Sequence, residues 1–220
     1  MSGRTAELTV LCEGPTEAGF ANRVLRPHLC AFGVHIQRAI PLNRANFGTM
    51  PFDRIRDAVK ADMGRLRAHQ FITSMIDLYA LRGFPRQDER AANPLAKVRN
   101  IEQGMAELLR SPQWIPYIQL HEFEALLYTD LDQLRASFPD EDLTGGIANL
   151  KQEVASLGPE DINEGNDTAP SKRLLRWIPG YQKATVGPDV AARITVKRLR
   201  ENCPHFGEWL SRLERLGGPR

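Results

Sequence analysis

Four acidic residues in this 220-residue sequence follow short apolar segments of the kind that form β-strands. In a parallel sheet, the carboxyl ends of the strands meet at one edge, and ligands bind in the crevice beyond that edge. Carboxylates gathered there repel one another and stay ionised only with a cation between them; Mg²⁺ (or Mn²⁺) suits this role and supports phosphoryl-ester hydrolysis. The alternative is that loops begin where strands end and are rich in Asp and Glu for that reason alone. The four residues are Glu13, Asp77, Glu122 and Glu124.

The segment after the first apolar run has the composition of a tight turn that leads into a helix. Gly14 allows a sharp turn, and Thr16 is a suitable N-cap for a helix that continues to about Leu29. The N–H groups at the start of such a helix point toward whatever binds at the turn. Glu17, in the first helical turn, is then either a further metal ligand or a favourable partner of the helix dipole.

The histidine after the fourth apolar run is a candidate for proton transfer. His121 and Glu124 are three residues apart, so a helix would place them on one face, with Glu122 pointing elsewhere. His121 would shuttle a proton or contact a phosphate, and Glu124 would act as metal ligand or base. The alternative is that His121 is a hydrogen-bonded structural residue beside a strand.

Basic residues open a later helix, where a positive charge opposes the helix dipole. Pro170 suits the first turn, and Thr168 or Ser171 can cap it. Lys172 and Arg173 are therefore unfavourable at this position unless an anion compensates them, which predicts a phosphate or nucleic-acid contact. The alternative is that their long side chains carry the charges into water.

Strand-like and helical segments alternate about four times over residues 1–130, which predicts an α/β core with a mostly parallel sheet covered on both faces. Residues 131–220 contain helical patterns only, and we expect this region to pack on the core as part of one compact unit. The expected strands cover residues 8–12, 34–40, 71–76 and 114–120, and the expected helices cover residues 17–29, 52–66, 95–108, 132–138, 147–157, 191–200 and 206–216, with one more beginning near residue 170.

The composition is that of a folded globular chain, with 42% hydrophobic and 25% charged residues. No apolar run reaches the roughly 18 residues of a membrane-spanning helix, and three cysteines form no CxxC pair, so we expect a cytoplasmic protein without disulfides. The net charge is only +2, but residues 118–169 carry 2 basic and 12 acidic residues, and residues 170–220 carry 11 basic and 4 acidic residues. This distribution suits a cation site beside a polyanion-binding surface, or simply solvated helix faces.

The segment from Leu8 to Glu17, with Glu13-Gly14-Pro15-Thr16-Glu17 as its turn, resembles the first strand and turn of Toprim (topoisomerase–primase) domains, especially those of the overcoming-lysogenization-defect nucleases. Nearly the whole chain is more specifically similar to the bacterial domain-of-unknown-function family 4276. The motifs that carry this similarity are Met75–Tyr79, Ile118–Leu127, Glu164–Arg173 and Cys203–Leu210.

The resemblance implies a Toprim-like fold, a Mg²⁺ site and a role in phage defence beside an ABC-type, overcoming-lysogenization-defect-like ATPase. Toprim domains place a glutamate after the first strand and an Asp-x-Asp pair after the third. Glu13 and Asp77 match the glutamate and the first Asp, whereas Tyr79 stands at the second Asp position. Glu122 or Glu124 would have to replace the missing carboxylate.

Two functions from different classes follow. The first is a Mg²⁺-dependent nuclease or related phosphoryl-transfer enzyme in which Glu13, Asp77 and Glu124 hold the metal, and Lys172 and Arg173 hold DNA or RNA. The second is a non-catalytic Toprim-like subunit that regulates an ATPase. Tyr79 at the second Asp position and the small net charge favour this alternative. Hydrolysis of a small nucleotide is a third alternative.

Overall fold

A computed structural model describes residues 5–43, 49–162, 165 and 167–218. Its centre is a five-stranded sheet in the order β2-β1-β4-β6, with β7 also paired to β4, and all of its pairings are parallel. A separate pair of short strands, β3 and β5, is parallel as well. The strands are β1 (Ala6–Cys12), β2 (Val34–Pro41), β3 (Met50–Pro51), β4 (Gln70–Asp77), β5 (Leu81–Arg82), β6 (Trp114–Ile115) and β7 (Ile118–Gln119).

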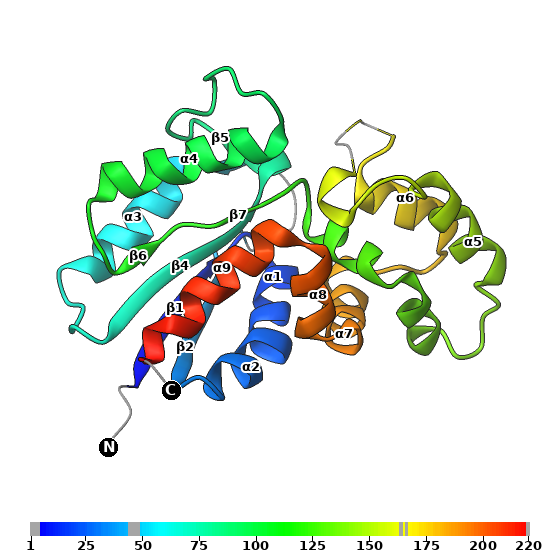
Figure 1. The fold of residues 1–220 in the computed structure, drawn as a ribbon, viewed down its shortest axis with the longest axis horizontal. Coiled ribbons are helices and arrows are strands. Elements are labelled where there is room, and N and C mark those ends of the chain that lie inside the picture. Colours follow the sequence, from blue (N-terminus) through cyan, green and yellow to red (C-terminus); the bar gives the residue numbers. More distant parts are fainter. Residues whose placement is uncertain (1–4, 44–48, 163–164, 166, 219–220) are drawn as a thin grey trace.

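Helices cover both faces of the sheet because its strands alternate apolar residues between the two sides (Figure 1). In β1, Val10 and Cys12 belong to the core shared with α1, α2 and α9, whereas Leu11 belongs to the core under α3 and α4. The expected α/β fold with a mostly parallel sheet is therefore confirmed. These helices are α1 (Pro15–Phe20), continued by a π-helical turn (Ala21–Leu25) into α2 (Arg26–Cys30), then α3 (Phe52–Met63), α4 (Pro94–Leu109) and α9 (Pro204–Glu214).

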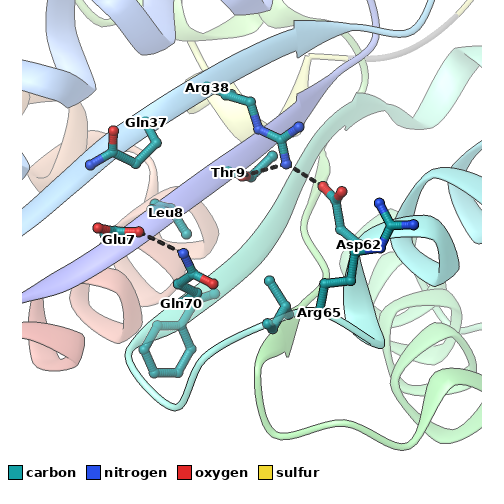
Figure 2. Close-up of a pocket in the computed structure, with 10 residues that line it drawn as sticks. Glu7, Leu8, Thr9, Gln37, Arg38, Asp62, Arg65 and Gln70 are labelled. Atoms are coloured by element: carbon teal, nitrogen blue, oxygen red, sulfur yellow. Dashed lines mark hydrogen bonds and ion pairs between the residues drawn. The ribbon is translucent and has the colours of Figure 1, made fainter.

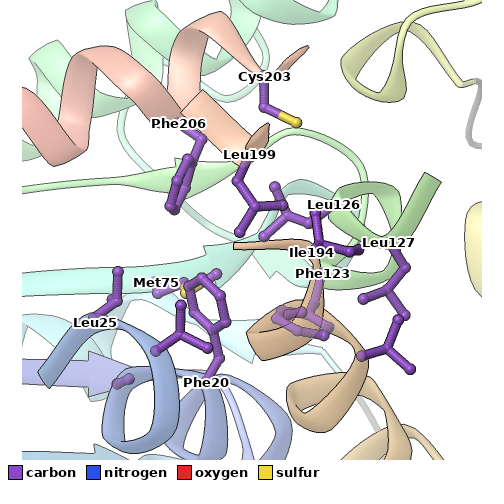
Figure 3. Packing of buried hydrophobic residues seen from close by; sticks show 14 of the residues in the cluster. Phe20, Leu25, Met75, Phe123, Leu126, Leu127, Ile194, Leu199, Cys203 and Phe206 are labelled. Carbon is purple, nitrogen blue, oxygen red and sulfur yellow. The ribbon is translucent and has the colours of Figure 1, made fainter. Parts of the chain in front are cut away.

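The chain after β7 is helical in the part that the structure describes, up to residue 218. Its helices share a hydrophobic core with the first half of the chain: Phe20 of α1 packs edge-on against Phe123 and Phe206, with ring centroids 5.4 and 6.0 Å apart (Figure 3). The additional elements are two 3₁₀ segments (Phe123–Thr129 and Leu131–Ser137), α5 (Thr144–Glu153), a 3₁₀ turn (Pro159–Asp161), α6 (Pro170–Trp177), α7 (Lys183–Ile194), α8 (Val196–Asn202) and a final 3₁₀ turn (Arg215–Gly217).

Two expected elements are divided in the structure. The single strand expected over residues 114–120 is divided into β6 and β7 at Pro116, which has no N–H to donate to the ladder. The single helix expected over residues 191–200 is broken between α7 and α8 at Thr195, which has a φ of 73°. Glu164, part of one motif above, lies outside the described residues. No described helix is long and apolar enough to cross a membrane.

Candidate active site

Glu13 and Asp77 lie side by side at the carboxyl edge of the sheet. β1 and β4 are neighbours, with Cys12 paired to Met75, and the N–H of Glu13 donates to Met75 O (3.0 Å). The N–H of Asp77 donates to Oε2 of Glu13 (3.0 Å), so the end of β4 fixes the side chain that follows β1. The parallel register thus brings together two residues that are 64 positions apart in the sequence.

The turn after β1 adds a third acid. Oε2 of Glu17 accepts a hydrogen bond from the N–H of Gly14 (2.7 Å), and Gly14 is the N-cap of α1. The expectation that Thr16 caps this helix is wrong, because Pro15 already occupies its first position and Glu17 bonds back to the N-cap residue. Glu17 is only 5% exposed, and its carboxyl group lines the same cavity as Glu13.

Glu122 and Glu124 approach the edge from the segment that follows β7. The expected helical face shared by His121 and Glu124 does not form, because the 3₁₀ helix begins at Phe123 and His121 has a φ of 63°. Instead, Glu122 and Glu124 both approach Nζ of Lys183, with carboxylate oxygens at 3.8 and 3.5 Å. His121 is 2% exposed, and its Nε2 lies 3.0 Å from the carbonyl oxygen of Glu160.

A cavity of about 430 Å³ connects these elements. Its floor carries the acidic side chains from β1, α1, β4 and the 3₁₀ helix, and its rim includes Leu175 of α6, which is 50% exposed. Lys183 is the one basic residue among the described residues that line it. The acidic lining residues are Glu13, Glu17, Asp77 and Glu124.

Burial makes this group of carboxyls resist ionisation. Burial, with repulsion by Glu17, raises the pKa of Glu13 to about 8. Burial raises the pKa of Glu124 to about 7, against the attraction of Lys183, and burial followed by repulsion from Glu13 raises the pKa of Asp77 well above its usual range. Burial also raises the pKa of Glu17. A second positive charge in the cavity would let more of these groups ionise.

Lys183 is the residue that already supplies positive charge here. Burial by itself lowers its pKa, but the neighbouring Glu124, Glu122 and Asp77 raise the pKa of Lys183 above its usual value. Oε1 of Glu124 accepts a hydrogen bond from the hydroxyl of Tyr181 (3.5 Å), so α7 and the segment before it supply two of the contacts to this carboxylate.

The donor set fits a hard divalent cation, because it consists of carboxylate oxygens. Oδ1 of Asp77 is buried and has no hydrogen-bond partner in the described part of the chain, which leaves an oxygen available for a ligand. No group of three or more His, Cys, Asp or Glu side chains among the described residues is arranged to hold a metal ion as it stands. Metal binding would therefore require carboxylate side chains to reorient, with Glu13, Asp77 and Glu124 as the nearest ligands.

The two residues expected to bind phosphate differ in exposure: Arg173 is buried, and Lys172 is exposed. Arg173 is committed to internal contacts, because its Nη1 pairs with Glu153 (2.5 Å) and its Nε donates to the carbonyl oxygen of Thr168 (2.8 Å). Lys172 is exposed on the same side of α6 as Leu175, and of these two only Leu175 lines the cavity. Ser171 is buried, and its N–H donates to Oε2 of Glu122 (2.9 Å).

Tyr79, at the position of the missing second Asp, does not contribute to the floor of the cavity. It lies in a 3₁₀ turn (Leu78–Ala80) immediately after β4 and is 56% exposed. Its N–H donates to the carbonyl oxygen of His121 (3.3 Å), which joins the end of β4 to the segment that leads to Glu122. Besides Glu13 and Asp77, the carboxyl groups that line the cavity are those of Glu17 and Glu124.

The sequence interpretation missed Lys183 and Tyr181. Tyr181 lies just before α7, and Lys183 is its first residue. This helix carries Gly187-Pro188 in its interior. That pair is a turn signal, so the helical pattern was expected to begin only at residue 191. Lys183 is one of 11 basic residues in the stretch 170–220, and its partner Glu124 is 59 positions away, so no local pattern in the sequence marks it.

A second pocket lies near the start of β1, at the opposite end of the strands (Figure 2). It is smaller, about 250 Å³, and several of its polar side chains are paired with one another. Arg38 bonds to Thr9 (3.4 Å) and pairs with Asp62. Gln70 donates to Glu7 (2.7 Å). The carboxyl-edge cavity is therefore the better candidate for a ligand in a parallel α/β sheet.

The family match covers nearly the whole chain, as the motifs in the sequence predict. The family described as "Domain of unknown function (DUF4276)" matches residues 12–214. The C-terminal region of the Burkholderia pseudomallei OLD protein has 15% identity and a TM-score of 0.46, with 97% of this chain and 100% of that chain covered. The C-terminal region of the Xanthomonas campestris pv. campestris OLD protein has 14% identity and a TM-score of 0.40, with 93% and 96% covered. No curated protein matches the chain.

Proposed function

This chain belongs to the DUF4276 family, and we propose that it is a Toprim-type, divalent-cation-dependent enzyme that hydrolyses phosphodiester bonds in DNA or RNA. The observation that carries the proposal is the meeting of Glu13, Asp77 and Glu124 in one cavity at the carboxyl edge of a parallel sheet. Residues from three separate segments have no reason to bury three carboxyl groups together for folding alone, because each raises the electrostatic energy of the others.

The chain's own residues would divide the work in the following way. Glu13 and Asp77 would hold the cation from the ends of β1 and β4, with the Asp77 N–H orienting the Glu13 carboxylate. Glu124 would complete the ligand set, and Glu122 or Glu17 would serve as a further ligand or as the base that orients water. When bound, Mg²⁺ or Mn²⁺ would supply Lewis-acid stabilisation of the developing negative charge and an acidified water.

Substrate binding would use the exposed face of α6. Lys172 and Leu175 lie on this face, and Leu175 lines the cavity. A nucleic-acid backbone placed there would bring a phosphodiester to the carboxylates. Arg173 has no part in this proposal, because Glu153 neutralises its guanidinium. His121 keeps only a structural part, through the contact of its Nε2 with Glu160.

The test is a cleavage assay on purified protein with single-stranded and double-stranded DNA and RNA, in Mg²⁺ and in Mn²⁺, alone and with a neighbouring ABC-type ATPase. We expect cleavage that Glu13→Gln and Asp77→Asn abolish. Glu7→Gln is the matched control, because Glu7 lies on the same strand as the residues leading to Glu13 but lines the second pocket. Undiminished cleavage by Glu13→Gln, or no cleavage under any of these conditions, would refute the proposal.

A second candidate, a non-catalytic subunit that docks on an ATPase, is favoured by one observation. Glu122 and Glu124 are paired with Lys183, and the described side chains are not arranged as a metal site. Calorimetry separates the two functions: tight association with the ATPase and no heat of Mn²⁺ binding would favour the subunit, whereas Mn²⁺ binding that Asp77→Asn abolishes would favour the enzyme.

A further inference from the structure

Lys183 places a positive charge beside two carboxylates of the segment that follows β7. Its Nζ lies 3.5 Å from Oε2 of Glu124 and 3.8 Å from Oε1 of Glu122. The side chain of Glu124 is 2% exposed, so this carboxylate can reach few partners other than the lysine and Tyr181. The carboxylate most deeply buried in the cavity is thus neutralised by a residue of the chain itself.

The backbone of Lys183 is held firmly, although its side chain is not. Lys183 is the first residue of α7, and α7 packs closely on α1, where a Cβ added to Gly19 would lie 2.9 Å from Cγ of Pro188. Gly187 is similarly close to the ring of Phe123, the first residue of the 3₁₀ helix that carries Glu124. The lysine side chain is 44% exposed, so its ammonium can leave the carboxylates and move into the open part of the cavity without any shift of α7.

We propose that the ammonium of Lys183 and a divalent cation compete for the carboxylate oxygens of Glu124 and Glu122, and that the displaced Lys183 becomes the contact for a substrate phosphate. The inference rests on the proposed function, because it assigns a role to the same cavity. Its physical reason is charge: an ammonium and a divalent cation that share one partly buried carboxylate repel each other, so each weakens the binding of the other.

The competition also accounts for the arrangement of the acids. With Lys183 in place, Glu122 and Glu124 are directed to Nζ from two sides, and the described side chains form no ready group of three metal ligands. Once the ammonium is released, it remains attached to the first residue of α7, which lines the same cavity as Glu13 and Asp77, where an anion drawn to the cation would meet it. A flexible ammonium is a suitable point charge for a phosphate oxygen.

The experiment measures Mn²⁺ binding to the full chain by isothermal calorimetry at low ionic strength, in the absence of nucleic acid. Lys183→Met, which keeps the length of the side chain but not its charge, should bind Mn²⁺ about tenfold more tightly than the wild type or better. Lys172→Met makes the same substitution on exposed α6, outside the carboxylates, and should change the Kd less than about twofold. Lys183→Arg retains the charge and should stay close to the wild type.

A second measurement keeps the test valid if Lys183→Met is poorly folded. Lys183→Gln and the wild type are unfolded thermally with and without 1–2 mM Mn²⁺ (on the order of the Kd), and the rise in Tm caused by Mn²⁺ should be larger for the variant even if its starting Tm is lower. An unchanged or weaker Mn²⁺ affinity in both neutral variants would overturn the competition while leaving the proposed enzyme intact. Tighter Mn²⁺ binding without any cleavage of nucleic acid would support the competition and refute the proposed enzyme.

Discussion

Replacing Glu13 by Gln should stabilise the metal-free protein at pH 8 while removing its capacity to bind a metal. The amide oxygen of glutamine can still accept the hydrogen bond from the N–H of Asp77 that Glu13 accepts at 3.0 Å. What the substitution removes is a carboxyl group whose pKa is raised from 4.5 to about 8, first by burial and then by repulsion from Glu17. The folded protein therefore holds the proton more tightly than the unfolded chain does.

The sign of the pH dependence follows from that difference. The contribution of Glu13 to the free energy of unfolding is fully present below about pH 4.5 and is lost as the pH rises toward about 8. At about 1.4 kcal/mol for each pKa unit, an isolated group would cost about 5 kcal/mol when fully ionised. Because Glu17 and Asp77 repel the same charge, a proton on one of them relieves the others, and we expect about 2–3 kcal/mol between pH 5 and pH 8.

The assay is thermal unfolding in EDTA at pH 5, 6, 7 and 8. A loss of about 2–3 kcal/mol corresponds to about 5–10 °C in Tm for a domain of this size. Glu13→Gln should match the wild type at pH 5 and exceed it by that amount at pH 8, whereas Glu7→Gln, on the same strand but outside the cavity, should keep the wild-type pH dependence. A Glu13→Gln variant that is no more stable than the wild type at pH 8 would refute the argument that the ionised carboxyl strains the fold.

Three further outcomes follow from other contacts. Arg173→Ala should lower the free energy of unfolding by about 2–3 kcal/mol in a urea titration, because it leaves Glu153 without its buried partner; a loss of nucleic-acid affinity with unchanged stability would contradict the structural assignment. Lys172→Ala should weaken nucleic-acid binding uniformly across sequences and reduce the slope of log Kobs against log salt by about 1 in a fluorescence titration. Gly19→Ala should lower the unfolding free energy by about 1–3 kcal/mol, because the new Cβ meets the ring of Pro188 at 2.9 Å.

The alternation of strands and helices was sufficient to predict where Glu13 and Asp77 meet. Once a sheet is parallel, the residues that follow its strands must lie at one edge, whatever their separation in the sequence. The positions of Glu13 and Asp77 therefore depend only on where β1 and β4 end. The sequence predicts the boundaries of these strands to within one or two residues. Their function as metal ligands stays a prediction.

Other parts of the site depend on backbone angles and on contacts between distant segments, which a periodic pattern does not encode. The relation between His121 and Glu124 depended on a helix that starts before residue 121, but His121 has a φ of 63° and the 3₁₀ helix begins two residues later. A change of two residues at the start of a short helix is enough to separate His121 from Glu124, which alone of the two lines the cavity. Pro116 was a readable signal for the division of the last strand, whereas nothing local marks Thr195 as the break between α7 and α8.

The position of Lys183 depends on tertiary packing alone. It is set by the close approach of α1 and α7 at Gly19 and Pro188 and by the contact of Gly187 with Phe123. Each of these contacts joins segments at least 60 residues apart, so no window of sequence contains both partners. The same glycine and proline that allow the approach also concealed the helix, because they are the residues that usually end one.

The energetics of the cavity support the proposed cation site. Backbone N–H groups of Gly14 and Asp77 and the ammonium of Lys183 compensate part of the buried charge, yet the pKa values of Glu13 and Glu124 still rise to about 8 and about 7. Glutamine or an apolar residue at either position would fill the same space without that penalty. A group of carboxyls that makes the metal-free fold less stable near neutral pH is what a cation site requires, since the binding free energy of the cation offsets the repulsion. The pH at which the metal-free protein loses stability should therefore coincide with the pH above which it gains affinity for Mn²⁺, because both changes report the loss of the same protons.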